Sequence, residues 1–225
     1  MSLCEILPFL SPDAEPMRRD QRAYDSVTDR YSVRFYRWCE PMVSIGRFQT
    51  LSPEFLARLA AHNIPWIRRP TGGQAILHQG DLTFSIVGPL PEGQAHHLLQ
   101  TYHHIAQGLI TGLASLNITA KTVSHEPVHK VIKNRPDACY GFTSQADLRV
   151  NDQKFIGCAQ VRRRRAFLQQ GVVYLEAPHA LHKALFQAEV PIADLKGLTG
   201  HYLAPERVVE ALGEGLKHQL MRPLS

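Results

Sequence analysis

Residues 68–85 read RRPTGGQAILHQGDLTFS and form the most informative segment of the chain. Two arginines precede a glycine pair, which lets the backbone turn sharply and approach a ligand closely. Adjacent N–H groups in such a turn can bind a carbonyl or phosphate oxygen. The residues after the turn predict a strand, with Ile76 and His78 on one face and Leu77 on the other. Taken alone, a hairpin whose glycines serve only geometry is the simpler interpretation.

Composition indicates a soluble globular protein. The 225 residues are 44% hydrophobic and 20% charged, which is ordinary for such proteins. We expect a single catalytic domain over residues 1–225, with a core at about 17–219. No apolar run approaches the ~20 residues of a membrane span, and the N-terminus lacks a basic signal-peptide region. The four cysteines show no framework spacing, which predicts free thiols and a cytoplasmic location.

The chain is basic, with a net charge of +5, and part of the excess lies in one run, residues 162–165. Such a run could contact an acidic protein, nucleic acid or a membrane, or could simply be a solvated hairpin tip. No helix-turn-helix, zinc-finger or aromatic-rich strand signature accompanies it. We therefore expect neither a nucleic-acid partner nor a membrane partner.

The order of patterns predicts an α+β fold with mixed and antiparallel sheets flanked by helices. A loop is expected at 11–16. Helices are expected at 17–29, 53–61 (with Ser52 as its N-cap), 93–116 and 205–219. Strands are expected at 31–38, 42–45, 65–69, 146–150, 155–161 and 166–175. The last three strands suggest an antiparallel meander, whose first turn is Asn151-Asp152.

Two histidine patterns are candidate metal sites. Residues 125–129, His-Glu-Pro-Val-His, match the letters of a zinc-protease motif, but that motif needs a helix, which Pro127 would break. The histidines on the expected 93–116 helix lack an evident carboxylate or cysteine partner. We therefore expect no metal.

Cys139 is the best candidate nucleophile in the chain. It lies in a polar loop, where a thiol is more accessible than in an apolar strand. A free thiol is mostly protonated at neutral pH and needs a nearby cation to become a thiolate. Lys154, at the head of a strand that pairs back toward this region, is the candidate cation.

Several segments resemble the lipoate/biotin protein ligase and octanoyltransferase superfamily. They are RRPTGGxAxxH at 68–78, KxxGxAQxR at 154–162, FLQQG at 167–171, and the strand-like segments 34–38 and 44–49. They occur in the family order and extend over about residues 17–175. The resemblance implies a biotin/lipoate ligase-like domain.

The element CYGFTS at 139–144 is similar to that of the cysteine-dependent octanoyltransferases. This resemblance implies transfer of an octanoyl group from the phosphopantetheine of acyl carrier protein to Cys139. The group then passes to the lysine of a lipoyl-domain protein such as glycine cleavage H protein, without a cofactor. The implied catalytic residues are Cys139 and Lys154. The implied substrate-binding residues are Arg68, Arg69, Thr71, Gly72, Gly73, Ala75, His78, Gly157 and Ala159. The implied partner-docking residues are Arg162, Arg163, Arg164 and Arg165.

Two alternatives remain open from the sequence. An ATP-dependent lipoate–protein ligase would use the same pocket with ATP and magnesium, and a non-catalytic module would only bind acyl or lipoyl proteins. The chain departs from the family pattern at Gln79, where the family usually has Asp, and at Gln170, where it usually has His. The loss of the carboxylate at position 79 weakens the ATP-dependent alternative slightly.

Overall fold

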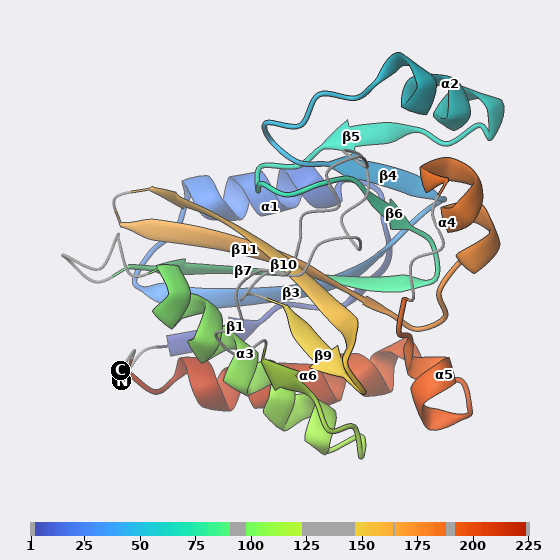
Figure 1. Cartoon of the computed structure of the whole chain (residues 1–225). Helices are drawn as coiled ribbons and strands as arrows, with labels where there is room; N and C mark the ends of the chain where they lie inside the picture. Colours follow the sequence, from blue (N-terminus) through green and yellow to red (C-terminus); the bar gives the residue numbers. More distant parts are fainter. Residues whose placement is uncertain (1–2, 91–97, 123–146, 164, 188–191, 224–225) are drawn as a thin grey trace.

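The computed structural model describes residues 3–90, 98–122, 147–163, 165–187 and 192–223 (Figure 1). The larger of two sheets in these residues has the strand order β1-β3-β7-β11-β10-β9-β8, and β2 pairs with β3. β1 and β2 run parallel to β3, and the other pairs are antiparallel. The strands are β1 Leu3–Ile6, β2 Leu10–Asp13, β3 Arg30–Trp38, β7 Asp81–Pro89, β8 Lys121–Thr122, β9 Leu148–Val150, β10 Gln153–Arg163 and β11 Ala166–Tyr174.

A small sheet of order β5-β4-β6 sits beside the large one. It consists of β4 Met42–Ile45, β5 Trp66–Arg68 and β6 Ile76–His78. The outer face of this sheet, with Val43 and Leu77, packs against helices α2 Pro53–Ala61 and α4 His179–Phe186. The other face, with Ile76, packs toward Val172 and Tyr174 of the large sheet.

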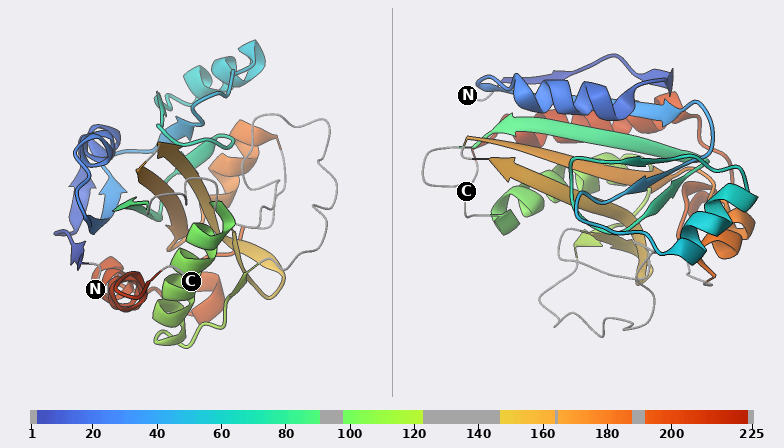
Figure 2. Two further views of the ribbon diagram at one scale, coloured as in Figure 1. Left: turned by 90° about the vertical axis from the view of Figure 1, so that its left-hand side faces the viewer. Right: turned by 90° about the horizontal axis from the view of Figure 1, so that it is seen from above.

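Helices cover both faces of the large sheet (Figure 2). On one face, α3 Leu98–Ala114 and α6 Pro205–Leu220 lie side by side over the main hydrophobic core. On the other face, α1 Pro16–Asp25 packs against β7 and β11. The short helix α5 Leu195–Thr199 contributes Leu195 to the main core. α3 and α6 approach so closely that a Cβ on Gly215 would lie only 2.3 Å from the Gly108 carbonyl oxygen.

Most expected elements are confirmed. The α+β class and the antiparallel meander are present, Ser52 caps α2 through the Phe55 N–H, and the Asn151-Asp152 turn has two positive φ angles. The helix expected at 17–29 ends at Asp25.

The prediction of a loop at 11–16 was wrong, because residues 10–13 form β2. Pro12 is compatible with this strand since β2 pairs with β3 alone, so that a missing N–H can face away from the sheet. The edge strand β1 was not expected at all. Expectations for residues 123–146 lie outside the described residues. Within the part of the chain that is described, no helix is long and apolar enough to span a membrane.

Candidate active site

The glycine turn is held by the two arginines that precede it. Buried Arg69 donates from Nη2 to the carbonyl oxygens of Gly72 (2.6 Å) and Gln74 (2.9 Å), and from Nη1 to that of Ser44 (3.0 Å). Arg68 Nη1 donates to carbonyl oxygens of the loop after β4, including that of Gly46 at 2.8 Å. Both guanidinium groups therefore hold backbone that surrounds the turn.

Gly46 and Gly73 bring two sequence motifs into contact. A Cβ on Gly46 would lie 1.8 Å from the Gly73 carbonyl oxygen, so a larger residue has no room there. Gly73 has a φ of +88°, which L side chains rarely adopt. The segments 44–49 and 68–78 thus form one surface, and both positions require glycine for different reasons.

A cavity lies where this surface meets strands β7, β10 and β11, and we call it the central cavity. It has a volume of about 40 Å³, so a ligand of more than a few atoms requires its lining side chains to move. Its lining residues are Met17, Ser44, Arg69, Gly73, Ile76, His78, Thr83, Gly157, Cys158, Ala159, Gln170, Gly171 and Val172. The structure therefore brings together five of the predicted substrate-binding residues: Arg69, Gly73, His78, Gly157 and Ala159.

Lys154 lies at the border of the central cavity. Its side chain is buried against Gly157, and its Nζ is 3.0 Å from Asp147 Oδ2. The other carboxylate oxygen, Asp147 Oδ1, accepts a hydrogen bond of 3.3 Å from the backbone N–H of Cys158. Asp147 was not predicted, since nothing in its local sequence marks it as a partner of Lys154. Cys139 lies outside the described residues.

Gln170 connects the glycine turn to helix α1. Thr71 Oγ1 donates to Gln170 Oε1 (2.8 Å), and Gln170 Nε2 donates to Asp20 Oδ2 (2.6 Å). Asp20 also accepts from Arg34, Tyr36 and Ser85, and is fully buried. Burial outweighs the Arg34 charge and these hydrogen bonds, and raises the pKa of the Asp20 carboxyl above its usual value. The family departure at position 170 thus places an amide where it can both accept from Thr71 and donate to Asp20.

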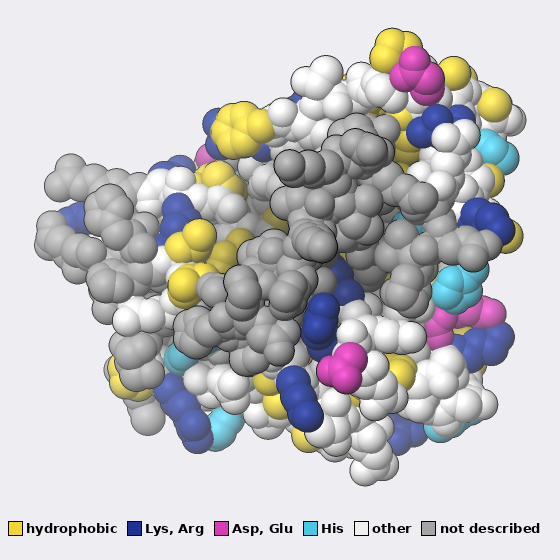
Figure 3. Space-filling model, in the orientation of Figure 1, with side chains coloured by type: hydrophobic (Ala, Val, Ile, Leu, Met, Phe, Trp, Pro, Cys, Tyr) yellow, Lys and Arg dark blue, Asp and Glu magenta, His cyan; other side chains and the backbone are white. Residues whose placement is uncertain are grey.

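Two other predicted substrate-binding residues, Arg68 and Ala75, do not line the cavity. Ala75 packs in the outer core of the small sheet, and Arg68 holds the loop after β4. Arg162 lies eight residues from Lys154 along β10, roughly 26 Å at ~3.3 Å per residue. Lys and Arg side chains are scattered over the face in Figure 3 rather than gathered in one patch.

Arg162 and Arg163 bind groups of this chain. The Arg162 guanidinium donates to Thr101 Oγ1 on α3. That of Arg163 donates to the carbonyl oxygens of Tyr24 and Asp25 at the end of α1. Arg165 is exposed, and Arg164 lies outside the described residues.

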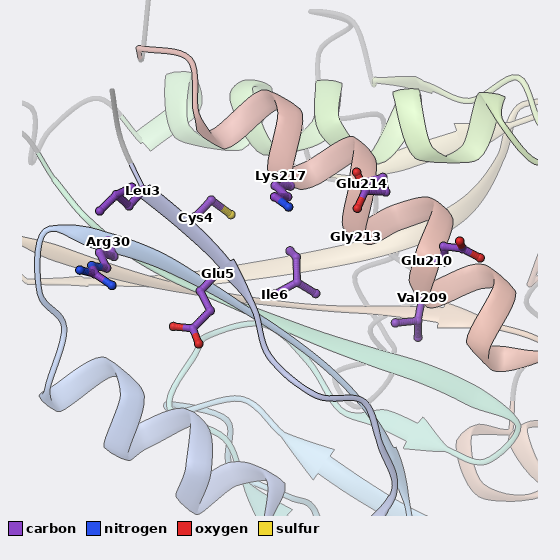
Figure 4. A pocket seen from close by; sticks show the side chains of 10 residues that line it. All are labelled: Leu3, Cys4, Glu5, Ile6, Arg30, Val209, Glu210, Gly213, Glu214 and Lys217. Atoms are coloured by element: carbon purple, nitrogen blue, oxygen red, sulfur yellow. The ribbon is translucent and has the colours of Figure 1, made fainter.

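A larger groove of about 500 Å³ separates β1 from α6 (Figure 4). Cys4 and Lys217 line it together with Glu5, Glu210 and Glu214. Burial raises the pKa of the Cys4 thiol to about 11, although the Lys217 charge acts in the opposite direction. This thiol is therefore protonated at neutral pH and is a poor nucleophile.

The described residues contain no group of three or more His, Cys, Asp or Glu side chains that could hold a metal ion. Of the histidines considered, His104 lies on α3 and contacts Gln219 of α6 through Nδ1 at 3.1 Å. His103 is exposed, and residues 96, 97 and 125–129 are outside the described part of the chain.

Comparisons with known proteins agree with the fold and the motifs. The family model of the lipoyl protein ligase A/B catalytic domain matches residues 12–216. Octanoyltransferase LipM of Kyrpidia tusciae is 32% identical over 206 residues, which cover 84% of this chain and 75% of the relative. LipM of Symbiobacterium thermophilum is 36% identical over 151 residues, or 64% of this chain and 54% of the relative. The chain thus spans about half to three quarters of the length of these relatives.

Solved structures share the fold. Lipoate-protein ligase A bound with ATP has a TM-score of 0.78 at 22% identity, covering 98% of this chain and 86% of the other. A chain from the structure of a bi-partite lipoate protein ligase and its E2 lipoyl domain from Thermoplasma acidophilum has a TM-score of 0.75 at 20% identity. That match covers 100% of this chain and 86% of the other. Because the family model spans nearly all of the sequence and the fold agrees with it, this chain belongs to the lipoyl protein ligase A/B family.

Proposed function

We propose that this chain is an octanoyltransferase of lipoate biosynthesis. It takes an octanoyl group from acyl carrier protein onto Cys139 as a thioester and passes it to a lysine of a lipoyl-domain protein. The curated relatives, which are named octanoyltransferases, support acyl transfer over ATP-dependent ligation.

The observation that carries the proposal is the Lys154–Asp147 pair at the border of the central cavity. A buried ammonium group is costly unless a counter-charge accompanies it, and Asp147 lies 3.0 Å away. Asp147 holds the Lys154 ammonium group beside Gly157, which lines the cavity together with the glycine turn. Such a charge stabilises both a thiolate and an oxygen that becomes negative during acyl transfer.

The reaction has two balanced steps. The Cys139 thiolate attacks the carbonyl carbon of the octanoyl thioester, and the phosphopantetheine thiolate leaves. The neutral amine of the acceptor lysine then attacks the octanoyl-cysteine, the amide bond forms, and the Cys139 thiolate leaves as the amine loses a proton. The first step exchanges one thioester for another and the second forms a more stable amide. The cycle therefore needs neither ATP nor another cofactor.

The proposed partners are acyl carrier protein as the donor and a lipoyl-domain protein, such as glycine cleavage H protein, as the acceptor. Acyl carrier protein is acidic, so basic side chains can steer its approach. Arg163 and Arg165 are the exposed residues of this run among those that the structure describes. We propose that the basic run at 162–165 steers the acidic carrier toward the site.

Intact-protein mass spectrometry after mixing with octanoyl-acyl carrier protein, without ATP, tests the proposal. We expect a gain of one octanoyl group that neutral hydroxylamine removes. Cys139→Ser should abolish the gain, whereas Cys158→Ser should retain it. Cys158 is the matched control because it is a cysteine whose residue lines the central cavity while its side chain packs against the main core.

Two results would overturn the proposal. Labelling of a lipoyl domain that requires free lipoate, ATP and magnesium, and survives Cys139→Ser, would establish a ligase. Binding of acyl carrier protein without transfer under either condition would indicate a non-catalytic module.

A further inference from the structure

Ser44, His78 and Asp81 form a hydrogen-bonded chain at the central cavity. Ser44 Oγ lies 2.7 Å from His78 Nε2, and His78 Nδ1 lies 2.9 Å from Asp81 Oδ2. The register of the small sheet explains the first contact. Ser44 pairs with Ile76 and Met42 pairs with His78, so Ser44 and His78 share one face of the sheet. Asp81 begins β7, three residues after His78.

One assignment of the protons satisfies each of these groups. Arg69 Nη1, which can only donate, is 3.3 Å from Ser44 Oγ. Ser44 Oγ therefore accepts from Arg69 and can donate its own proton to His78 Nε2. The Asp81 carboxylate accepts from His78 Nδ1. These contacts allow the neutral tautomer of His78 in which the lone pair of Nε2 faces the serine hydroxyl.

Two further contacts hold the imidazole ring and its carboxylate in place. The ring of Trp38 stacks on that of His78 at 4.3 Å, with 26° between their planes. Trp38 Nε1 donates to Thr83 Oγ1 (3.0 Å), and Thr83 Oγ1 donates to Asp81 Oδ2 (2.8 Å). Each polar side chain of the Ser44–His78–Asp81 network thus has a partner. The imidazole ring of His78 cannot rotate without losing several of these contacts.

A hydrogen-bonded network of this kind can serve only to satisfy buried polar groups. The position of this network at the central cavity indicates a chemical role as well. Ser44 and His78 both line the central cavity, whose other walls include the apolar side chains of Ile76, Val172 and Met17. An activated hydroxyl therefore faces a narrow and partly apolar space. Arg69 supplies a positive charge beside that hydroxyl.

We propose that Ser44 is a second acyl-accepting nucleophile, served by His78 as general base and by Asp81 as the residue that positions His78. Its substrates are esters or thioesters of apolar acyl groups. Ser44 Oγ bonds to the acyl carbon as its proton moves to His78 Nε2, and the departing alkoxide or thiolate then takes that proton. Water attacks the acyl-serine in the same way, releasing the carboxylic acid and restoring Ser44. This activity goes beyond the proposed transfer and does not involve Cys139.

Octanesulfonyl fluoride tests this directly, because an activated serine forms a stable sulfonate ester with it and releases fluoride. Peptide mapping of the treated full-length protein should find the octylsulfonyl group on Ser44, in wild type and in Cys139→Ser alike. Ser44→Ala should lose this adduct. Ser85→Ala should retain it, because Ser85 is also buried but bonds to Asp20 without a histidine.

The rate of labelling separates activation from mere exposure. Both His78→Gln and Asp81→Asn should lower it, His78→Gln by about 10²-fold or more, the usual contribution of a general base. Circular dichroism and a thermal unfolding scan establish that each variant is folded. A wild-type protein with no adduct on Ser44, or a folded His78→Gln protein that labels at the wild-type rate, would overturn the proposal. Octanoyl transfer through Cys139 would stand in either case.

Discussion

Replacement of Asp20 by Ala should destabilise the fold strongly. The Asp20 carboxylate accepts hydrogen bonds from Arg34 (2.7 Å), Tyr36 (2.9 Å), Ser85 (2.6 Å) and Gln170 (2.6 Å). Arg34 keeps its second carboxylate, Asp13, at 2.7 Å, whereas buried Tyr36, Ser85 and Gln170 lose this acceptor. The cost includes one lost buried ion pair, and such losses cost about 3–5 kcal/mol.

The matched control is Asp25→Ala on the same helix. Asp25 is exposed, and its nearest cation, Arg163 Nη1, is 3.6 Å away. An exposed pair of this kind contributes about 0–1 kcal/mol. The two variants share a helix and a residue type, so the difference between them isolates the buried network.

Urea unfolding followed by circular dichroism measures both variants. We expect the midpoint to fall sharply for Asp20→Ala, with an unchanged slope, and to move little for Asp25→Ala. Because Gln170 links Asp20 to Thr71, octanoyl transfer should also slow in the folded Asp20→Ala protein. If the two variants agree within about 1 kcal/mol, of the order of an exposed pair, the network does not stabilise the fold as argued here.

Three further predictions concern the helix pair, the acid response and Lys154. Gly215→Ala should destabilise by about 1–3 kcal/mol, because its Cβ would meet α3 backbone at 2.3 Å. Gly213→Ala on the same helix meets only ordinary contacts and should stabilise by about 0.5–1 kcal/mol, which thermal unfolding would distinguish. Burial, and to a lesser extent the charge of His179, lowers the pKa of His182 from 6.5 to about 4. The unfolded chain therefore gains this proton first, so the free energy of unfolding should fall by at most about 3 kcal/mol as the pH drops from 6.5 to 4. His182→Gln should remove that part of the pH profile, and an unchanged profile would contradict this origin. Asp147→Asn should slow octanoyl transfer by about 10²-fold through misplacement of Lys154, and a wild-type rate in single-turnover assays would refute it.

Local signals predicted the elements that are stabilised locally. Ser52 and Pro53 define the start of α2. The Asn151-Asp152 pair forms the hairpin turn between β9 and β10, because both residues tolerate positive φ. The alternation after the glycine turn placed Ile76 and His78 on the face that lines the central cavity. In each case the information lies within a few residues of the feature.

The missed features depend on distant partners. Asp20 and Asp147 look like ordinary surface carboxylates in the sequence, and only the fold buries them against Arg34 and Lys154. The departure from the family pattern at Gln170 is visible in the sequence, but the role of Gln170 as a bridge depends on Asp20, 150 positions away. β1 and β2 are short and acquire their structure by pairing with β3. Local sequence patterns do not predict such contacts between distant residues.

The two arginines at the end of β10 affect how the hairpin opens. Neighbouring side chains of a strand point to opposite faces, and here Arg162 reaches α3 while Arg163 reaches the end of α1. The last carbonyl groups of a helix lack intrahelical donors, so Arg163 also completes the end of α1. A hairpin tip is normally the first part of a sheet to fray, and its amides exchange with deuterium quickly. In this protein Arg162 and Arg163 bind helices on opposite faces of the sheet, so their own backbone amides should exchange more slowly than is usual near a hairpin tip.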